Sequence, residues 1–115
     1  MTGPDEHLRR RRADVARRLA HITDDIAELR GDRGAESADD EHDPEGVTLS
    51  VEWSRLEGLR AAASTELDDI DAALGRRASG TYGVCLTCGR AIPVARLEVR
   101  PDATRCVDCA TASGR

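Results

Sequence analysis

Apolar residues fall into two long helical patterns along the first two thirds of the chain. The positions of the first pattern are Leu8, Val15, Leu19, Ile22, Ile26 and Leu29. From Val15 onward the gaps alternate between four and three residues, which is typical of the narrow apolar seam of a coiled coil. Pro4 and Asp5 suit a helix start, and Gly31 and Gly34 are expected to end this helix.

The second pattern begins after Pro44 and Gly46 and ends at Gly80. Its apolar positions are Leu49, Trp53, Leu56, Ala63, Leu67, Ile70 and Leu74. Arg60 occupies one seam position here, as Arg12 does in the first helix. Because each helix has only one seam, we expect the two to pair as a long antiparallel hairpin over residues 1–79. The connection between them, at about 31–46, is long for a helix pair, and such connections tend to be functional or disordered.

Composition favours an exposed helical hairpin over a conventional globular core. The 115 residues include no Phe, one Trp and one Tyr, and 34% of them are charged, so little apolar surface is available per residue. The formal net charge of -5 argues mildly against generic nucleic-acid binding. No apolar run is long enough for a membrane span or a signal peptide, so we expect a cytoplasmic protein with no membrane association.

Four cysteines in the last third of the chain form two CxxC pairs. Cys85 and Cys88 are separated by 17 residues from Cys106 and Cys109, the spacing of a four-cysteine zinc site. Each short turn aims two sulfurs at one metal, and the second turn completes a tetrahedron. A thioredoxin-like redox role would need a βαβ context that the pattern lacks. Because four thiolates leave no position for a catalytic water, we predict one structural zinc ion and no enzymatic activity.

The segment between the two cysteine pairs is expected to form a short hairpin or a short helix. The apolar residues that it could bury are Ile92, Val94, Leu97 and Val99. A module of about 35 residues with so few apolar groups needs a bound metal to fold. The predicted fold is therefore mainly α: a coiled-coil hairpin followed by a small zinc-finger module over residues 80–115.

Carboxylates gather in the connection between the two helices. Residues 36–46 contain no Lys or Arg and carry Glu36, Asp39, Asp40, Glu41, Asp43 and Glu45. Like charges at a bend repel one another and do not stabilise a fold. The cluster is therefore either a solvated loop or a group held out toward a cation or a basic partner.

The hairpin, the acidic bend and the cysteine module together resemble the DksA/TraR family of bacterial transcription regulators. The motifs that carry the resemblance are GTYG at residues 80–83, Gly89, Ile92, Arg96, Leu97, Pro101 and the two CxxC pairs. The resemblance implies direct binding to RNA polymerase by a coiled coil that enters the secondary channel. Acidic tip residues then lie near the catalytic magnesium and modulate initiation, often together with the nucleotide ppGpp. The zinc module of the family packs at the base of the coiled coil.

The same resemblance identifies candidate tip residues. The family tip is written DxxDxA, and Asp40 and Asp43 match its two aspartates, whereas Glu45 stands at the alanine position. The resemblance therefore assigns partner binding to Asp40 and Asp43, with Asp39 and Glu45 as additional candidates. It does not fix whether the effect is activation or inhibition.

Two alternatives remain open at this point. A nucleic-acid-binding zinc finger could follow phosphates with arginines of the module, namely Arg90, Arg96, Arg100 and Arg105. The module has no stacking aromatic apart from Tyr82, so we expect no direct sequence-specific DNA binding. The chain could also be a coiled-coil adaptor for another protein. The run from Arg9 to Arg12, with Arg17 and Arg18, could contact phosphate, but pairing with acids of the second helix is favoured.

Overall fold

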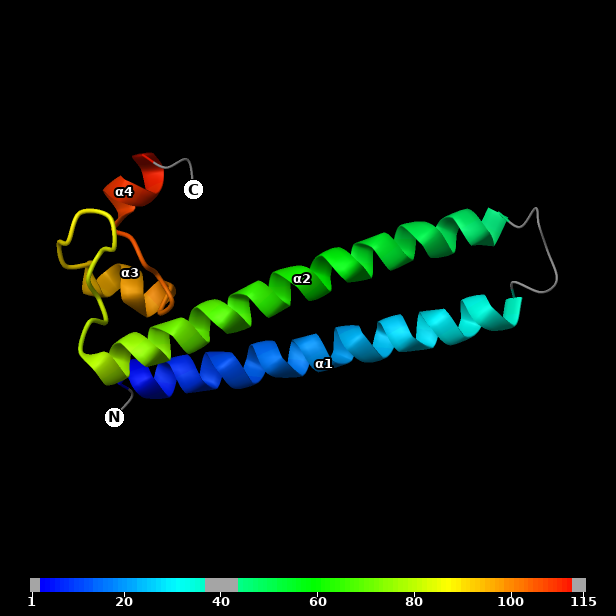
Figure 1. The fold of residues 1–115 in the computed structure, drawn as a ribbon, viewed down its shortest axis with the longest axis horizontal. Helices are drawn as coiled ribbons and strands as arrows, with labels where there is room; N and C mark the ends of the chain where they lie inside the picture. The colour runs from blue at the N-terminus through cyan, green and yellow to red at the C-terminus, as the bar shows by residue number, and fades with distance from the viewer. Residues whose placement is uncertain (1–2, 37–43, 113–115) are drawn as a thin grey trace. The chain divides into compact units, whose positions relative to one another are not determined.

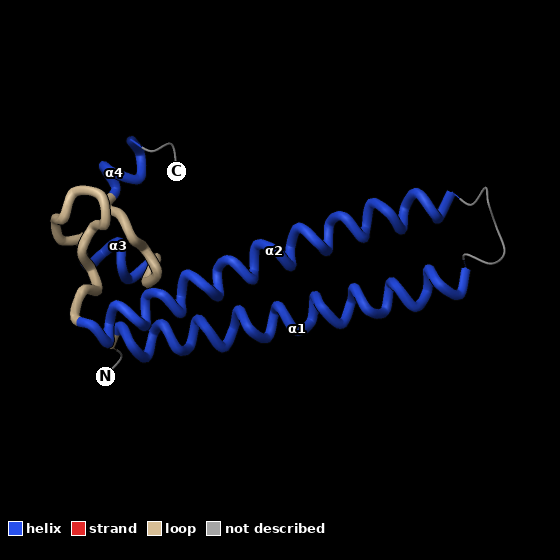
Figure 2. The backbone as a smooth tube through the Cα atoms, viewed as in Figure 1, coloured by secondary structure: helices blue, strands red, loops and turns tan. Residues whose placement is uncertain are grey.

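The structure, a computed structural model, describes the backbone of residues 3–36 and 44–112 and the side chains of residues 3–31 and 48–112. The described residues form four helices: α1 (Pro4–Glu36), α2 (Pro44–Ser79), α3 (Val94–Val99) and α4 (Val107–Ala112). Those described ranges consist of helices and loops (Figure 2), and their only β pairing is an isolated bridge between Val84 and Ala91. The prediction of a mainly α fold is confirmed.

The chain divides into two compact units. The first, which we call the cysteine unit, comprises residues 1–13 and 67–115, and the second, the hairpin unit, comprises residues 14–66. Each unit contains its own stretch of α1 and its own stretch of α2.

Within each unit the two stretches of helix lie antiparallel (Figure 1). In the hairpin unit, Arg18 pairs with Glu66 at 3.3 Å, and the guanidinium of Arg30 lies 4.9 Å from the centre of the Trp53 ring. A step forward along α1 is thus matched by a step of nearly equal length back along α2. The cysteine unit shows the same direction, because Asp5 pairs with Arg77 whereas Arg12 pairs with Asp71.

The predicted seams supply most of the core of each unit, although Ala73 is buried where the pattern had placed Leu74 on the seam. The buried side chains of the hairpin unit are Val15, Ile22, Ile26, Leu56 and Ala63, and those of the helices in the cysteine unit are Leu8, Ile70 and Ala73. Arg12 tolerates its seam position because its guanidinium reaches the carboxylate of Asp71 at 2.5 Å. That ion pair raises the pKa of Arg12 and lowers the pKa of Asp71.

The helix boundaries at the connection differ from the prediction. Gly31 and Gly34 do not end α1, which continues to Glu36, and α2 begins at Pro44 rather than after Gly46. A glycine inside a helix costs only about 1 kcal/mol relative to alanine, which flanking turns can offset. Proline is tolerated in the first turn of a helix because its missing N–H would have no partner there. The connection is therefore shorter than the predicted range of about 31–46.

The end of α2 follows the prediction. Gly80 adopts a positive φ of 81°, a conformation that favours glycine, and the N–H of Thr81 donates to the carbonyl of Arg76 at 2.9 Å. This is the helix stop that directs the chain into the cysteine-bearing segment.

Candidate metal centre

The first cysteine pair is placed by a tight turn that follows α2. The N–H of Cys85 donates to the carbonyl of Arg90 at 2.8 Å, and the N–H of Gly89 donates back to the carbonyl of Cys85 at 2.9 Å. Gly89 has a φ of 75°, so a side chain at this position would be strained. The turn therefore folds Cys88 back toward Cys85.

The second pair lies at the start of α4 and is tied to the first by backbone hydrogen bonds. The N–H of Leu86 donates to the carbonyl of Thr104 at 2.8 Å, just before Cys106. The Nε of Arg96 donates to the carbonyl of Arg105, also at 2.8 Å, which connects α3 to the same segment. Two turns that are distant in sequence therefore face each other.

These turns bring all four predicted ligands together. The Sγ atoms of Cys85, Cys88, Cys106 and Cys109 lie within 4.8 Å of one another, and those of Cys88 and Cys106 are 3.9 Å apart. Four sulfurs at about 2.3 Å from one zinc ion would form a tetrahedron with edges of about 3.8 Å. The donor set and its spacing therefore fit zinc, and no other metal-competent group of His, Cys, Asp and Glu occurs among the residues described.

The electrostatics of the four thiols also favour a bound cation. The N–H of Cys88 lowers the pKa of Cys85 to about 6, which favours its thiolate. Hydrogen bonds with the sulfurs of Cys106 and Cys85, followed by burial, raise the pKa of Cys109 to about 12, which favours its neutral thiol. Several thiolates can coexist in so small a space only when a divalent cation balances them.

The structure of the segment between the cysteine pairs agrees with the sequence prediction only in part. It forms the short helix α3, and Ile92 is buried as expected. Val94 and Val99, which were expected to be buried, are 70% and 75% exposed. The physical reason is that α3 has only six residues and none of them is buried, so zinc ligation rather than burial of these valines stabilises the module, as predicted from its few apolar groups.

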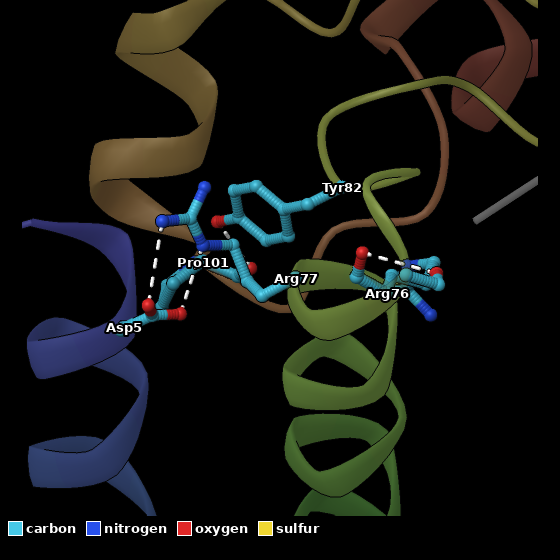
Figure 3. Close-up of polar contacts among 6 residues, drawn as sticks. Asp5, Arg76, Arg77, Tyr82 and Pro101 are labelled. Carbon is cyan, nitrogen blue, oxygen red and sulfur yellow. Dashed lines mark hydrogen bonds and ion pairs between the residues drawn. The ribbon is translucent and has the colours of Figure 1, made fainter.

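A polar network joins the start of α1, the end of α2 and the cysteine segment (Figure 3). Arg77 donates from Nε to Asp5 at 2.8 Å, and its guanidinium carbon lies 5.5 Å from the centre of the Tyr82 ring. The hydroxyl of Tyr82 donates to the carbonyl of Pro101 at 2.8 Å. The bond from Arg77 lowers the pKa of Asp5, and burial raises the pKa of Tyr82. No local pattern in the sequence predicts this network, since only the glycines on either side of Tyr82 signal a special turn.

Several of the arginines that could contact phosphate are engaged in other interactions. Arg18 pairs with Glu66 and Arg12 with Asp71, so pairing with acids of the second helix is confirmed for these two. Arg17 instead pairs with Asp14 of its own helix. Arg96 is used inside the cysteine unit through its bond to the carbonyl of Arg105. These contacts weaken the nucleic-acid-binding alternative.

The predicted acidic tip residues Asp39, Asp40 and Asp43 lie outside the described residues, as does the side chain of Glu45. Their role remains a prediction. Among the helices that the structure describes, none combines the length and the apolar character that crossing a membrane requires.

Asp69 on α2 provides a pH-dependent prediction for the cysteine unit. Partial burial, followed by repulsion from Asp102 and Asp68, raises its pKa from the ordinary value of 3.8. The folded chain therefore keeps the carboxyl of Asp69 protonated to higher pH than the unfolded chain does. Proton binding by Asp69 favours the folded state at low pH, and this contribution to stability is lost as pH rises through the raised pKa. Asp69→Asn should raise the melting temperature at pH 7 by about 1–3 °C, with the gain vanishing below about pH 4.

Thermal melts of Asp69→Asn at pH 3.5 and pH 7 would check this expectation. Asp24→Asn, at an exposed position of α1, is the control and should have little effect at either pH. An equal gain for Asp69→Asn at both pH values would contradict it.

Known proteins match this chain in sequence. Residues 80–113 match the family described as the prokaryotic dksA/traR C4-type zinc finger. The RNA polymerase-binding transcription factor DksA of Haemophilus influenzae is 28% identical over 99 residues, which cover 85% of this chain and 60% of that protein. An uncharacterized protein of Aquifex aeolicus is 40% identical over 55 residues, covering 48% of this chain and 38% of that protein. The chain thus matches less than two thirds of the length of either relative.

Solved structures match over nearly the whole chain. Transcription factor DksA2 from Pseudomonas aeruginosa has a TM-score of 0.78 at 24% identity, covering 96% of this chain and 80% of that one. The DnaK suppressor protein from Agrobacterium tumefaciens has a TM-score of 0.58 at 36% identity, covering 95% and 89%. Together with the four clustered sulfurs, the zinc-finger match shows that Cys85, Cys88, Cys106 and Cys109 form a site for one structural zinc ion.

Proposed function

Since the chain belongs to the DksA/TraR family of C4-type zinc-finger proteins, we propose that it is a cytoplasmic transcription regulator that binds RNA polymerase directly. The observation that carries this proposal is the zinc-finger match over residues 80–113, combined with fold similarity over nearly the whole chain. The name of the Haemophilus relative states that it binds RNA polymerase. The chain would act by binding, without catalysing a reaction of its own.

The length of the two long helices supports a more specific proposal, that the hairpin enters a channel of the polymerase. Helices α1 and α2 contain 33 and 36 residues. At about 1.5 Å per residue, each is roughly 50 Å long, enough to enter a narrow channel of a large enzyme. The family resemblance identifies that channel as the secondary channel of RNA polymerase, and the acidic connection between the helices would enter first.

The carboxylates of that connection supply the proposed chemistry. Asp40 and Asp43 would approach the catalytic magnesium, where they could perturb its coordination or pair with basic groups around it. Initiation would change as a result. Glu45 stands where the family motif has alanine, so it adds a carboxylate to this connection. The nucleotide ppGpp is a candidate co-regulator on the resemblance alone, and sequence-specific DNA binding is not part of the proposal.

Binding to purified RNA polymerase tests the proposal. The polymerase is loaded with Fe²⁺ in place of its catalytic magnesium, so that hydroxyl radicals form at the active site. We expect a stable complex in which the chain is cleaved within residues 37–43 and is spared at α3 and α4. Addition of excess Mg²⁺ should suppress the cleavage.

The outcomes separate the parts of the proposal. A failure to bind polymerase would contradict the function as a whole. Binding without cleavage near residues 37–43 would retain the partner and reject insertion into the channel. Salt-sensitive binding to bare DNA, unchanged after deletion of residues 36–46, would favour the nucleic-acid-binding alternative.

A further inference from the structure

A groove with a volume of about 690 Å³ lies within the cysteine unit. One wall is the first turns of α1, the other is α3, and Tyr82 lies between them. The hydroxyl of Tyr82 is held by the carbonyl of Pro101, and its ring lies beside Arg77, which also binds Asp5 of α1 (Figure 3). The groove is therefore preformed, because the same network fixes α1 and Tyr82.

The α3 wall is apolar at its opening. Val94 lines the groove and is 70% exposed, and Leu97 behind it is partly buried. On the opposite wall Pro4 adds a further apolar surface. A concave site of this size with apolar walls and a few polar groups is suited to bind a protruding side chain.

The α1 wall carries positive charge. Arg10 lines the groove within the run from Arg9 to Arg12, and His7 lies one turn before it. Arg12 is paired with Asp71, whereas Arg10 has no ion-pair partner within residues 3–31 and 48–112. The positive end of the α1 dipole is close by. A carboxylate next to an apolar side chain would complement this wall, although the chain as a whole has a net charge of -5.

We propose that this groove is a docking site for an acidic segment of a partner protein that presents one large apolar side chain. The apolar side chain would enter between Val94, Leu97 and Tyr82, and an adjacent carboxylate would pair with Arg10. Glu98 on the α3 wall would accept a hydrogen bond from the same segment. The proposal rests on the proposed function in one respect, since the partner protein is RNA polymerase. It concerns a surface that shares no residue with the acidic connection.

The two ends of α3 provide a matched pair of variants. Val94→Glu places a carboxylate at the opening of the groove, where it should repel an acidic segment and remove the apolar contact. Val99→Glu makes the same change at a residue that is equally exposed but does not line the groove. A glutamate at the first position of a helix is tolerated, so Val94→Glu should preserve α3.

We expect Val94→Glu to weaken the binding of purified core RNA polymerase by about tenfold or more, and Val99→Glu by less than about twofold. Arg10→Glu should weaken binding several-fold at low salt, and the difference from wild type should shrink as salt screens the lost ion pair. Arg90→Glu changes the net charge equally at an exposed residue outside the groove, and it should have a smaller effect. Zinc content and circular dichroism of each variant establish that the fold is retained.

The result that would overturn the proposal is equal polymerase binding by wild type, Val94→Glu and Arg10→Glu. Polymerase binding by wild type would then still support the proposed function, so the two failures are distinguishable. If wild type does not bind polymerase at all, both proposals fail together. Self-association of wild type in sedimentation that Val94→Glu abolishes would also overturn it, because the occupant would then be a second copy of the chain.

Discussion

Replacing Cys85 by serine is expected to abolish zinc binding and to unfold the cysteine unit. Cys85 is only 1% exposed, and its sulfur lies within 4.8 Å of the other three. Structural zinc contributes about 10–16 kcal/mol to the folding of zinc-finger peptides, whereas whole domains are stable by about 5–15 kcal/mol. The few buried apolar residues between the cysteine pairs cannot offset a loss of that size.

Metal analysis and hydrogen exchange would check this expectation. Wild type should hold one zinc ion per chain, and Cys85→Ser far less than one. The amides of Leu86 and Ile92, which donate to the carbonyls of Thr104 and Gly83, should lose their protection. Thr87→Ala alters an exposed side chain in the same turn and should change neither measurement. A Cys85→Ser protein with full zinc content and unchanged protection would refute the expectation.

Converting Asp40 and Asp43 to asparagine is expected to abolish the effect on transcription and to leave polymerase binding nearly unchanged. The amides keep the size of the side chains and remove the negative charges that would act on the catalytic cation. Affinity would come mainly from other surfaces, the groove of the cysteine unit among them. The double variant should therefore bind within about threefold of wild type while initiation in vitro returns to the level of polymerase alone.

A matched control is available on α1. Asp24→Asn with Asp25→Asn removes the same two charges from exposed positions of the hairpin unit, and it should regulate initiation as wild type does. If the tip variant binds and regulates as wild type does, the carboxylate mechanism is wrong. If it loses binding as well, the tip contributes affinity rather than chemistry alone.

Local patterns in the sequence were sufficient to predict the helices, their seams and the zinc ligands. The burial of Val15, Ile22 and Ile26 follows from a spacing that repeats within a few turns. The clustering of the cysteines follows from two short turns, each of which carries its own signal in the CxxC spacing. Such features depend on neighbouring residues, so periodicity and spacing reveal them.

Features that depend on the pairing register or on several distant segments could not be predicted. The contacts of Arg77 with Asp5 and of Arg12 with Asp71 depend on the register in which the two helices pair. The glycine positions placed the end of α1 too early and the start of α2 too late. The exposure of Val94 and Val99 depends on how the short helix α3 packs against the rest of the cysteine unit, which involves distant segments. The groove is formed by three segments that lie far apart in the chain, and no local pattern connects them.

The composition of the cysteine unit has a consequence for the order of folding during synthesis. Its core joins Leu8 to Ile70 and Ala73, so residues 1–13 cannot complete their packing until the second helix has emerged from the ribosome. Contacts between such distant residues carry a cost in loop-closure entropy, which slows their formation. The hairpin unit, whose residues are contiguous, can form first and bring the two distant segments together. Metal capture by the last cysteine pair would then be a late event that commits the nascent chain to its final fold.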